Sequence, residues 1–256
     1  MQQLTITFRP DRAPIEGKHV TTSGLHGLLF YVLQQANPAA AEWLHNHAAP
    51  KPFTMAPYYT EAGHLQGLRY TALSDEAAGI LHHAWTLAHQ SQQQLRLGRY
   101  QTFTVREVQS LPASSFYQLA HESLPASTLT LHFLSPTSFK QGPGDLPLPL
   151  PANVFGSLWR AWNAFAPALL RLEDVWLDWC AQDIFVAAHQ IYTIAVSFNR
   201  NTDFIGFVGQ ATFRAPRGRD ADRRVWHALS QFAAYSGVGR KTAMGMGITT
   251  CEPVES

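Results

Sequence analysis

The sequence has few cysteines and few charged residues. Cys180 and Cys251 are its only thiols, and neither lies in a spacing typical of metal ligands. A disulfide framework is therefore not indicated, and the reducing cytoplasm is the expected compartment. Charged residues make up 14% of the chain and hydrophobic residues 46%. This balance excludes disorder on compositional grounds and provides ample material for a packed core.

Long hydrophobic runs are also missing. No apolar stretch approaches the ~20 residues that a membrane-spanning helix needs. The first ten residues, MQQLTITFRP, lack the basic start and the apolar core of a secretory signal. We therefore expect a cytoplasmic protein that does not associate with membranes.

The chain also lacks a strong net charge, since its formal net charge is only +1 at pH 7. The charge is unevenly distributed, however. Residues 200–241 contain eight basic and three acidic residues, which leaves the rest of the chain net acidic. Such asymmetry suits a local anionic partner, although an ordinary solvated surface gives the same pattern.

The first half of the chain alternates strand-like and helix-like segments. Residues 4–8 (LTITF) alternate apolar and polar side chains, as a half-buried strand does. Ser74 can cap a helix with Asp75 and Glu76 in its first turn. The apolar residues expected on the buried face of that helix are Ala77, Leu81, Ala84, Trp85 and Ala88. Further strands are predicted at 67–73 and 101–108, with one more near Phe53, and helices over 25–35 and from there to about residue 47.

The second half repeats this alternation. An edge-like opening strand is predicted at 128–134, and the proline-rich segment 142–151 is predicted to be an extended loop. A helix is expected over 220–235, ended by Gly237 with positive φ. Its buried side should carry Val225, Trp226, Leu229, Phe232 and Ala233. The remaining predicted elements are helices at 152–165 and 167–179 and strands at 191–197, 204–213 and 245–251.

The two repeats predict an α+β protein with two tandem ferredoxin-like (RRM-like) domains, 1–125 and 126–256. The junction is expected at 124–127 (LPAS). This fold often binds RNA on its open sheet face, but it supports many unrelated functions. The fold class alone does not identify the activity.

The segment 237–247 (GVGRKTAMGMG) is the first candidate site. Its candidate RNA-binding residues are Gly237, Gly239, Arg240, Lys241, Gly245 and Gly247. Glycines allow a backbone to approach phosphates closely and to turn its N–H groups toward them. The segment is neither a Walker loop nor a dinucleotide-binding loop, because its context differs from both. A mobile surface loop is the simpler alternative for this segment. Lys140 is a further candidate for RNA binding, and its simpler alternative is an ordinary solvated lysine.

A second candidate site lies at 44–54 (LHNHAAPKPFT), which holds two histidines and a lysine. RNA can be cut without a metal when a base activates the 2′-hydroxyl and an acid protonates the leaving 5′-oxygen. Histidine can fill either role, and lysine can stabilise the negative charge that develops. The alternative is that His45 and His47 are ordinary helix-end residues. His19 and His26 have no companion pattern, and the adjacent His82 and His83 face different directions on a helix, so no metal site is expected.

These segments together resemble the CRISPR-associated endoribonucleases of the RAMP superfamily, which cut the repeat transcript into guide RNAs. The segments that carry the resemblance are GLHGLLFYVLQ, NPAAAEWLHNHAAPKPFTMAP, LHFLSPTSFK, LPLPLPANVFGSLWRAWN, SFNRNTDFIGFVGQATFR and GVGRKTAMGMG. The resemblance implies two ferredoxin-like domains and cofactor-free, metal-independent cleavage at a repeat hairpin. The expected products are a 2′,3′-cyclic phosphate and a 5′-hydroxyl.

By position, the resemblance implies that His45 is the catalytic histidine and Lys51 the supporting lysine. Some members place a catalytic tyrosine in the first helix, whereas alignment through Gly27 puts Phe30 there. Tyr31 is the next residue, but one step rotates a helical side chain by roughly 100°. Tyr31 is therefore a third catalytic candidate only through a local shift, and His47 is a rival to His45.

The departure at Phe30 keeps an alternative function open. A non-catalytic RNA-binding subunit of a CRISPR effector complex would retain the loop and lose the chemistry. The expected partner is in either case a repeat RNA hairpin. Effector-complex subunits and a second copy of the chain are further partners that the resemblance allows.

Overall fold

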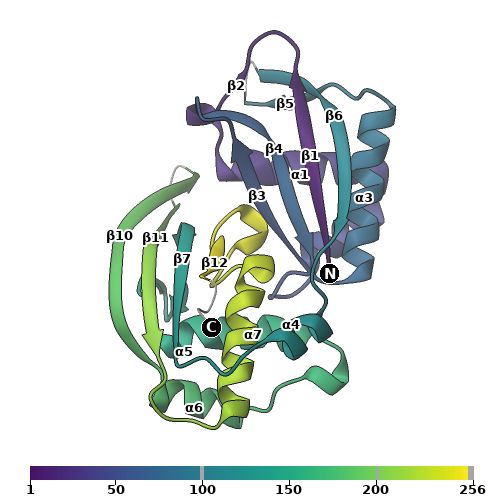
Figure 1. The fold of residues 1–256 in the computed structure, drawn as a ribbon. Helices are drawn as coiled ribbons and strands as arrows, with labels where there is room; N and C mark the ends of the chain where they lie inside the picture. Colours follow the sequence, from purple (N-terminus) through teal and green to yellow (C-terminus); the bar gives the residue numbers. More distant parts are fainter. Residues whose placement is uncertain (99–100, 200–201, 253–256) are drawn as a thin grey trace. The chain divides into compact units, whose positions relative to one another are not determined.

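A computed structural model describes residues 1–98, 101–199 and 202–252. The chain divides into two compact units (Figure 1). The first unit comprises Met1–Ala113 and Ala243–Gly245, and the second comprises Ser114–Thr242 and Met246–Ser256. The main division thus falls at 113/114, and the domain boundary at 125/126 stays a prediction from sequence.

The first unit is built on a six-stranded antiparallel sheet. Its strand order is β2-β4-β1-β6-β5, and β3 also pairs with β4. Leu4, Ile6 and Phe8 alternate inward along β1, which confirms the strand that the sequence predicts at 4–8. The strands are β1 (Gln2–Pro10), β2 (Ile15–Glu16), β3 (Phe53–Tyr59), β4 (His64–Ala72), β5 (Leu95–Leu97) and β6 (Gln101–Pro112).

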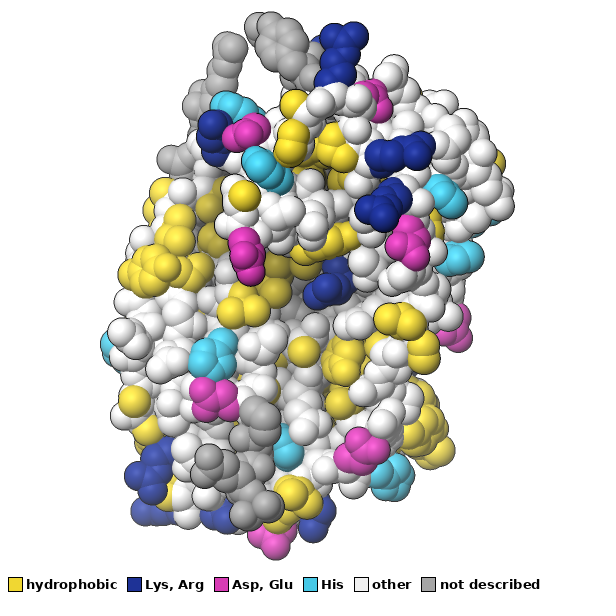
Figure 2. Space-filling view, turned by 45° about the horizontal axis from the view of Figure 1, so that its top comes forward, with side chains coloured by type: hydrophobic (Ala, Val, Ile, Leu, Met, Phe, Trp, Pro, Cys, Tyr) yellow, Lys and Arg dark blue, Asp and Glu magenta, His cyan; other side chains and the backbone are white. Residues whose placement is uncertain are grey.

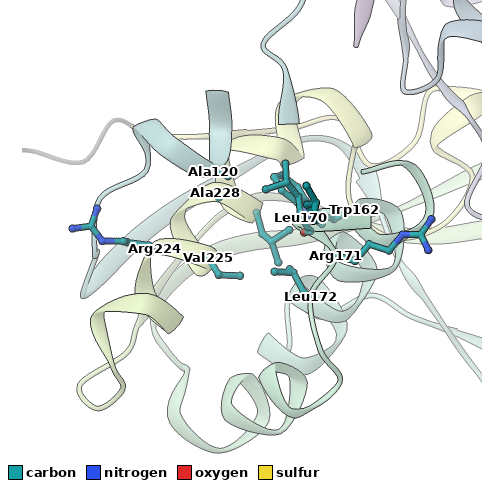
Figure 3. Close-up of a pocket in the computed structure, with 10 residues that line it drawn as sticks. Ala120, Trp162, Leu170, Arg171, Leu172, Arg224, Val225 and Ala228 are labelled. Carbon is teal, nitrogen blue, oxygen red and sulfur yellow. Dashed lines mark hydrogen bonds between the residues drawn. The ribbon is translucent and has the colours of Figure 1, made fainter. Parts of the chain in front are cut away.

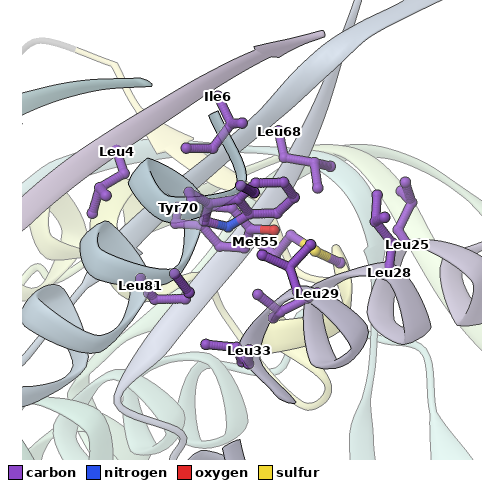
Figure 4. Packing of buried hydrophobic residues seen from close by; sticks show 14 of the residues in the cluster. Leu4, Ile6, Leu25, Leu28, Leu29, Leu33, Met55, Leu68, Tyr70 and Leu81 are labelled. Carbon is purple, nitrogen blue, oxygen red and sulfur yellow. The ribbon is translucent and has the colours of Figure 1, made fainter. Parts of the chain in front are cut away.

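Three α-helices and one short 3-10 helix complete this unit, namely α1 (Thr22–Ala36), α2 (Pro38–Asn46), α3 (Asp75–Gln90) and η1 (Gly17–His19). Ser74 caps α3 by accepting a hydrogen bond from the Ala77 N–H, and all five apolar positions predicted for this helix are buried. Figure 4 shows leucines of α1 and side chains of β1 and β4 gathered in one core. Ala243, from the short segment assigned to this unit, belongs to the same core.

The second unit repeats the plan with a four-stranded antiparallel sheet ordered β10-β11-β7-β12. Its strands are β7 (Thr128–Thr137), β10 (Phe185–Asn199), β11 (Thr202–Arg214) and β12 (Thr249–Cys251), and β8 (Phe139–Gln141) and β9 (Gly144–Leu146) form a separate hairpin. The helices are α4 (Phe116–Glu122), α5 (Pro151–Phe165), α6 (Val175–Asp183), α7 (Asp220–Ser236) and η2 (Ala168–Leu170). The 3-10 helix η3 (Thr242–Met244) begins in this unit and ends in the short segment assigned to the first.

Both units have the βαββαβ order of a ferredoxin-like domain. In each, the first and third strands are neighbours at the centre of the sheet, and the second and fourth flank them. The tandem ferredoxin-like fold class is therefore confirmed. The sheets and their helices enclose two separate sets of apolar side chains, which is why the hydrophobic pattern repeats along the sequence.

The structure corrects five local predictions in the second unit. The opening strand β7 is an inner strand, not an edge, because β11 and β12 both pair with it. Segment 167–179 is a 3-10 turn followed by α6 rather than one helix, and segment 142–151 includes the short strand β9. The last strand begins at Thr249, because Gly245 and Gly247 have positive φ and interrupt any extended run before it. On α7 only Val225 is less buried than predicted.

Candidate functional site

The first candidate site is an open groove between α1 and α2 in the first unit. Thr21 caps α1, and Asn37 caps α2 with Pro38 in its first turn. These caps fix both helix starts, so the position of each side chain along its helix is defined. His26 and Phe30 lie one turn apart on α1, and His45 lies in the last turn of α2. The groove has a volume of about 810 Å³.

Three aromatic rings form a cluster in this groove. The ring centroids of His26 and Phe30 are 4.7 Å apart, and those of Phe30 and His45 are 5.1 Å apart with an edge-to-face geometry. The two imidazole centroids are separated by 6.4 Å. His26 and His45 therefore face the same space, and Phe30 supports both rings.

His26 is the site residue that sequence reasoning missed. It is half-buried, and burial lowers the pKa of its imidazole; the nearby positive charges of His45 and Lys51 lower this pKa further. A neutral imidazole near pH 7 is a competent proton acceptor. His26 lies four residues before Phe30, which occupies the position of the expected catalytic tyrosine, and this helical spacing is the sequence signal that points to His26.

Lys51 lies against the C-terminal end of α2. Its ammonium group donates to the main-chain oxygens of Leu44 at 3.2 Å and of His45 at 2.6 Å. Carbonyls in the last turn of a helix have no partner within the helix and attract a cation. Partial burial lowers the pKa of the Lys51 amine. Lys51 thus fixes the backbone that carries His45 and adds positive charge near His26.

Tyr31 and His47 lie differently from the two facing histidines. Tyr31 lines the groove and is 50% exposed, but Phe30 is the residue whose ring meets His45. The His47 ring packs on Trp43 with a centroid distance of 5.2 Å, and its Nδ1 lies 2.8 Å from the Ala48 oxygen. His47 borders a neighbouring shallow pocket rather than the groove of His26 and His45. The geometry thus favours His45 over His47 as the partner of His26.

The glycine segment of the C-terminal region is closely packed rather than open. Gly237, Gly239, Gly245 and Gly247 all have positive φ, which confirms the conformation predicted for Gly237. A Cβ on Gly239 would stand 2.4 Å from the Ser138 oxygen, and one on Gly247 would stand 2.1 Å from the Val238 oxygen. Glycine is required at these two positions because the backbones approach too closely for any side chain.

The N–H groups of the same segment bond mainly within the protein. Val238 donates to the Gly247 oxygen at 2.8 Å, Arg240 to the Ser138 oxygen at 3.1 Å, and Gly247 to the Pro136 oxygen at 3.1 Å. Gly239 donates to the Ser157 hydroxyl at 3.1 Å. These amides are consequently not turned toward a phosphate as the glycine pattern suggested.

The three basic side chains predicted to bind RNA also have protein partners. Arg240 forms an ion pair with Asp145 of β9. The Lys241 ammonium lies 3.7 Å from the ring centroid of Phe198; burial lowers the pKa of its amine, and the Arg240 charge adds to this effect. Lys140 donates to the Pro143 oxygen at 2.9 Å across the β8–β9 turn. Figure 2 shows Lys and Arg side chains as small separate groups, several of them beside acidic side chains.

A separate cavity of about 200 Å³ lies in the second unit between α4, α7 and the η2 segment. Trp162, Leu170 and Ala228 line it, and Figure 3 shows the guanidinium ends of Arg171 and Arg224 pointing away from its centre. The lining is mostly apolar, and neither guanidinium group is directed into the cavity. The cavity is therefore a weaker candidate for a reactive site than the groove between α1 and α2 that holds His26 and His45 (the histidine groove).

Over residues 1–98, 101–199 and 202–252, no group of three or more His, Cys, Asp or Glu side chains is placed to hold a metal ion. Over the same residues, no helix has both the length and the apolar character needed to cross a membrane.

Comparison with known proteins identifies related sequences and structures. The family described as CRISPR-associated endoribonuclease Cas6 matches residues 131–249. A Cas6 endoribonuclease of Mycobacterium tuberculosis is 27% identical over 99% of this chain and 79% of its own length. A Cas6 endoribonuclease of Streptococcus thermophilus is 24% identical over 55% of this chain and 57% of its own length.

Solved structures agree over the whole length. A Cas6 product complex superimposes with a TM-score of 0.81 at 28% identity, covering 98% of this chain and 99% of that one. A structure of Thermus thermophilus Cas6 superimposes with a TM-score of 0.72 at 26% identity, covering 98% of each chain. Together with the tandem ferredoxin-like units, these matches show that the chain is similar in sequence and fold to CRISPR-associated endoribonucleases over nearly its whole length.

Proposed function

We propose that this protein is a metal-independent endoribonuclease that cuts CRISPR repeat RNA into guide RNAs. The observation that carries the proposal is the pair His26 and His45, whose ring centroids lie 6.4 Å apart across an open groove. A group that transfers a proton must come within about 2.6–3.2 Å of its partner atom. Two imidazoles at this separation can therefore contact one phosphodiester from opposite sides.

The lowered pKa of His26 indicates that His26 accepts a proton in this reaction and that His45 donates one. The neutral His26 imidazole accepts the proton of the 2′-hydroxyl as its oxygen attacks the adjacent phosphorus. The bond from phosphorus to the 5′-oxygen breaks, and a protonated His45 gives its proton to that leaving oxygen. The products are a 2′,3′-cyclic phosphate and a 5′-hydroxyl, and no metal or redox step enters.

Lys51 acts on this reaction mainly through position and charge. Its two hydrogen bonds hold the end of α2, so the His45 ring keeps its place relative to His26. Its positive charge favours the anionic, five-coordinate phosphorus of the transition state. Tyr31, exposed in the same groove, offers its hydroxyl to a neighbouring phosphate or ribose.

RNA binding also involves the second unit in this proposal, through Arg240, Lys241 and Lys140. The glycines Gly237, Gly239, Gly245 and Gly247 act there by shaping a rigid backbone that presents the two basic side chains. The close contacts at Gly239 and Gly247 support this role, because they fix the loop against the ends of β7 and α7.

The test is cleavage of repeat RNA by purified protein in EDTA. We expect one discrete cut, which is lost in His45→Ala and kept in His47→Ala. His47 is the matched control because it lies two residues from His45 but borders a neighbouring pocket instead of the groove. Cleavage that requires magnesium, or that is unchanged in His45→Ala, would overturn the mechanism. Tight binding of repeat RNA by the wild-type protein without any product would instead identify a non-catalytic RNA-binding subunit.

A further inference from the structure

The histidine groove holds more polar side chains than the proposed proton transfers use. Beyond the cluster of three rings, its lining includes Tyr31 and Gln34 of α1 and Glu42 and Asn46 of α2. All four are exposed. In the described part of the chain, no hydrogen bond or ion pair joins any of these four side chains to another protein group. They are therefore available to a substrate that lies in the groove.

Glu42 is the one acidic side chain among the described residues that line the groove. It precedes His45 by three residues on α2, so the two lie about 4.5 Å apart along the helix axis and on neighbouring parts of its surface. An ionised carboxylate only accepts hydrogen bonds, and a phosphodiester also offers acceptors alone. Glu42 therefore repels a phosphate. The parts of RNA that it can bind are those that donate, namely base N–H groups and the 2′-hydroxyl.

Guanine is the base whose donors match a carboxylate best. On its Watson–Crick edge an N1–H and a 2-amino group lie side by side, so each carboxylate oxygen can accept one hydrogen bond. Adenine, cytosine and uracil place a single donor group beside an acceptor on this edge, and that acceptor would face a carboxylate oxygen.

Tyr31 supplies a surface on which such a base can stack. Its side chain is 50% exposed and lines the same groove. Tyr31 lies six residues before the helix junction at Asn37 and Glu42 lies five residues after it, so the two stand at a similar position along the groove. Unpaired bases of RNA are commonly bound by this combination of an aromatic ring and hydrogen bonds to the Watson–Crick edge.

We propose that Glu42 reads the unpaired base of the nucleotide that carries the leaving 5′-oxygen and selects guanine there, with the base stacked on Tyr31. The inference rests on the proposed function, because His45 serves the leaving oxygen and Glu42 lies nearly one turn before His45 on the same helix. The nucleotide on the other side of the cut lies toward His26 on α1. Cleavage thus depends on the base at the cut, since a base that leaves the carboxylate unpaired holds the phosphate poorly between the two imidazoles.

The first test compares repeat RNAs that differ only in the nucleotide directly 3′ of the mapped cut. In single-turnover cleavage by the wild type, guanine should be cut fastest and inosine, which lacks the 2-amino group, more slowly. Adenine should be slowest, about 5- to 150-fold below guanine. Glu42→Gln should cut all three at similar rates, because an amide donates as well as accepts.

Glu61→Gln is the matched control for this test. It removes the same charge from an exposed residue in the turn between β3 and β4, and it should keep the wild-type order of rates. A role of Glu42 through charge alone predicts that Glu42→Gln speeds the cleavage of all three RNAs equally. That result, or an unchanged order in Glu42→Gln, overturns the proposal.

A second test measures binding and does not depend on cleavage. Each unpaired guanine of the repeat RNA is replaced in turn by inosine, and the affinity is measured for His45→Ala and for His45→Ala/Glu42→Gln. We expect one replacement to weaken binding to His45→Ala by about fivefold and to have no effect on the double variant. A wild type that cuts no repeat RNA overturns the proposed function, whereas this Glu42-dependent loss still supports the base readout. Normal cleavage with no inosine effect, or with the same loss in both proteins, overturns the base readout alone.

Discussion

The histidine groove and the glycine segment carry the two halves of the proposed activity, and they differ in how their polar groups are used. In the groove, His26 and His45 face an open space with their rings supported mainly by Phe30. In the glycine segment, six N–H groups bond to the protein and Arg240 is paired with Asp145. The groove leaves its reactive atoms available, whereas the glycine segment uses most of its own to hold a shape.

This difference shows that a glycine-rich, basic segment and a phosphate-binding backbone are separate properties. Glycine is necessary at Gly239 and Gly247 because of the close approach of other backbone atoms. This requirement for glycine does not indicate that the segment binds a ligand. The histidine groove, in contrast, is arranged for proton transfer, because the imidazoles of His26 and His45 face one another beside the partly buried amine of Lys51.

The largest effect is expected from His26→Ala. Loss of a general base typically slows a reaction by about 10²–10⁴-fold, and we expect this loss in single-turnover cleavage in EDTA with RNA affinity nearly unchanged. His82→Ala, an exposed histidine of α3, serves as control and should cleave normally. Because the two groups act on one step, the double variant His26→Ala/His45→Ala should be hardly slower than either single variant. A His26→Ala protein with wild-type cleavage removes His26 from the mechanism.

The second prediction concerns the glycine segment. Gly247→Ala should lower the free energy of unfolding by about 3 kcal/mol, because the new Cβ meets the Val238 oxygen and the backbone has positive φ. Gly142→Ala is the matched control, since Gly142 also has positive φ but has open space around its Cα. It should cost about 1 kcal/mol. Urea unfolding measures both, and equal losses would show that φ alone, without the close contact, explains the glycine.

The third prediction tests the electrostatic link from Lys51 to His26. Burial and two nearby cations lower the pKa of His26, so its neutral, base-competent form persists to lower pH than in a free histidine. Removing one cation in Lys51→Met should raise this pKa. The acidic limb of the cleavage rate should then move to higher pH in single-turnover profiles at saturating protein. In Lys140→Met, which changes a lysine of the other unit, the limb should stay in place; an unmoved limb in Lys51→Met would limit Lys51 to holding α2.

Much of the fold follows from local sequence signals. Ser74 caps α3 and its five apolar positions are buried, because capping and helical periodicity act within a few residues. The sequence pattern of β7 predicts an edge strand, because the residues of the strand itself carry no signal that β11 and β12 both pair with it. Strand order depends on contacts between residues far apart in sequence, so the pattern within one strand does not determine it.

The candidate site divides in the same way. His45 and Lys51 are six residues apart, and their region could be found from sequence because both contribute to one helix end. His26 could not be joined to them from sequence. The 18 residues between His26 and His45 include the junction of two helices, and only the folded arrangement of these helices brings the two rings together. The partner of Arg240 is equally remote, because Asp145 lies on a separate hairpin. Their proximity results from tertiary packing.

The smallest predicted effects concern the charges of the glycine segment. If Arg240 and Lys241 contact phosphates, replacing either should flatten the slope of log affinity against log salt by ~0.7–0.9 per lost contact. Asp145→Asn should act in the opposite direction, because the freed Arg240 becomes available to the RNA and the local charge rises. We therefore expect tighter binding and a steeper slope in Asp145→Asn, measured by salt-titrated RNA binding, and a flatter slope in Lys241→Met. Unchanged slopes in Arg240→Gln and Lys241→Met would remove this segment from the RNA interface. Its ion pair and its internally bonded backbone would then be purely structural, and the histidine groove would need a different surface to hold its substrate.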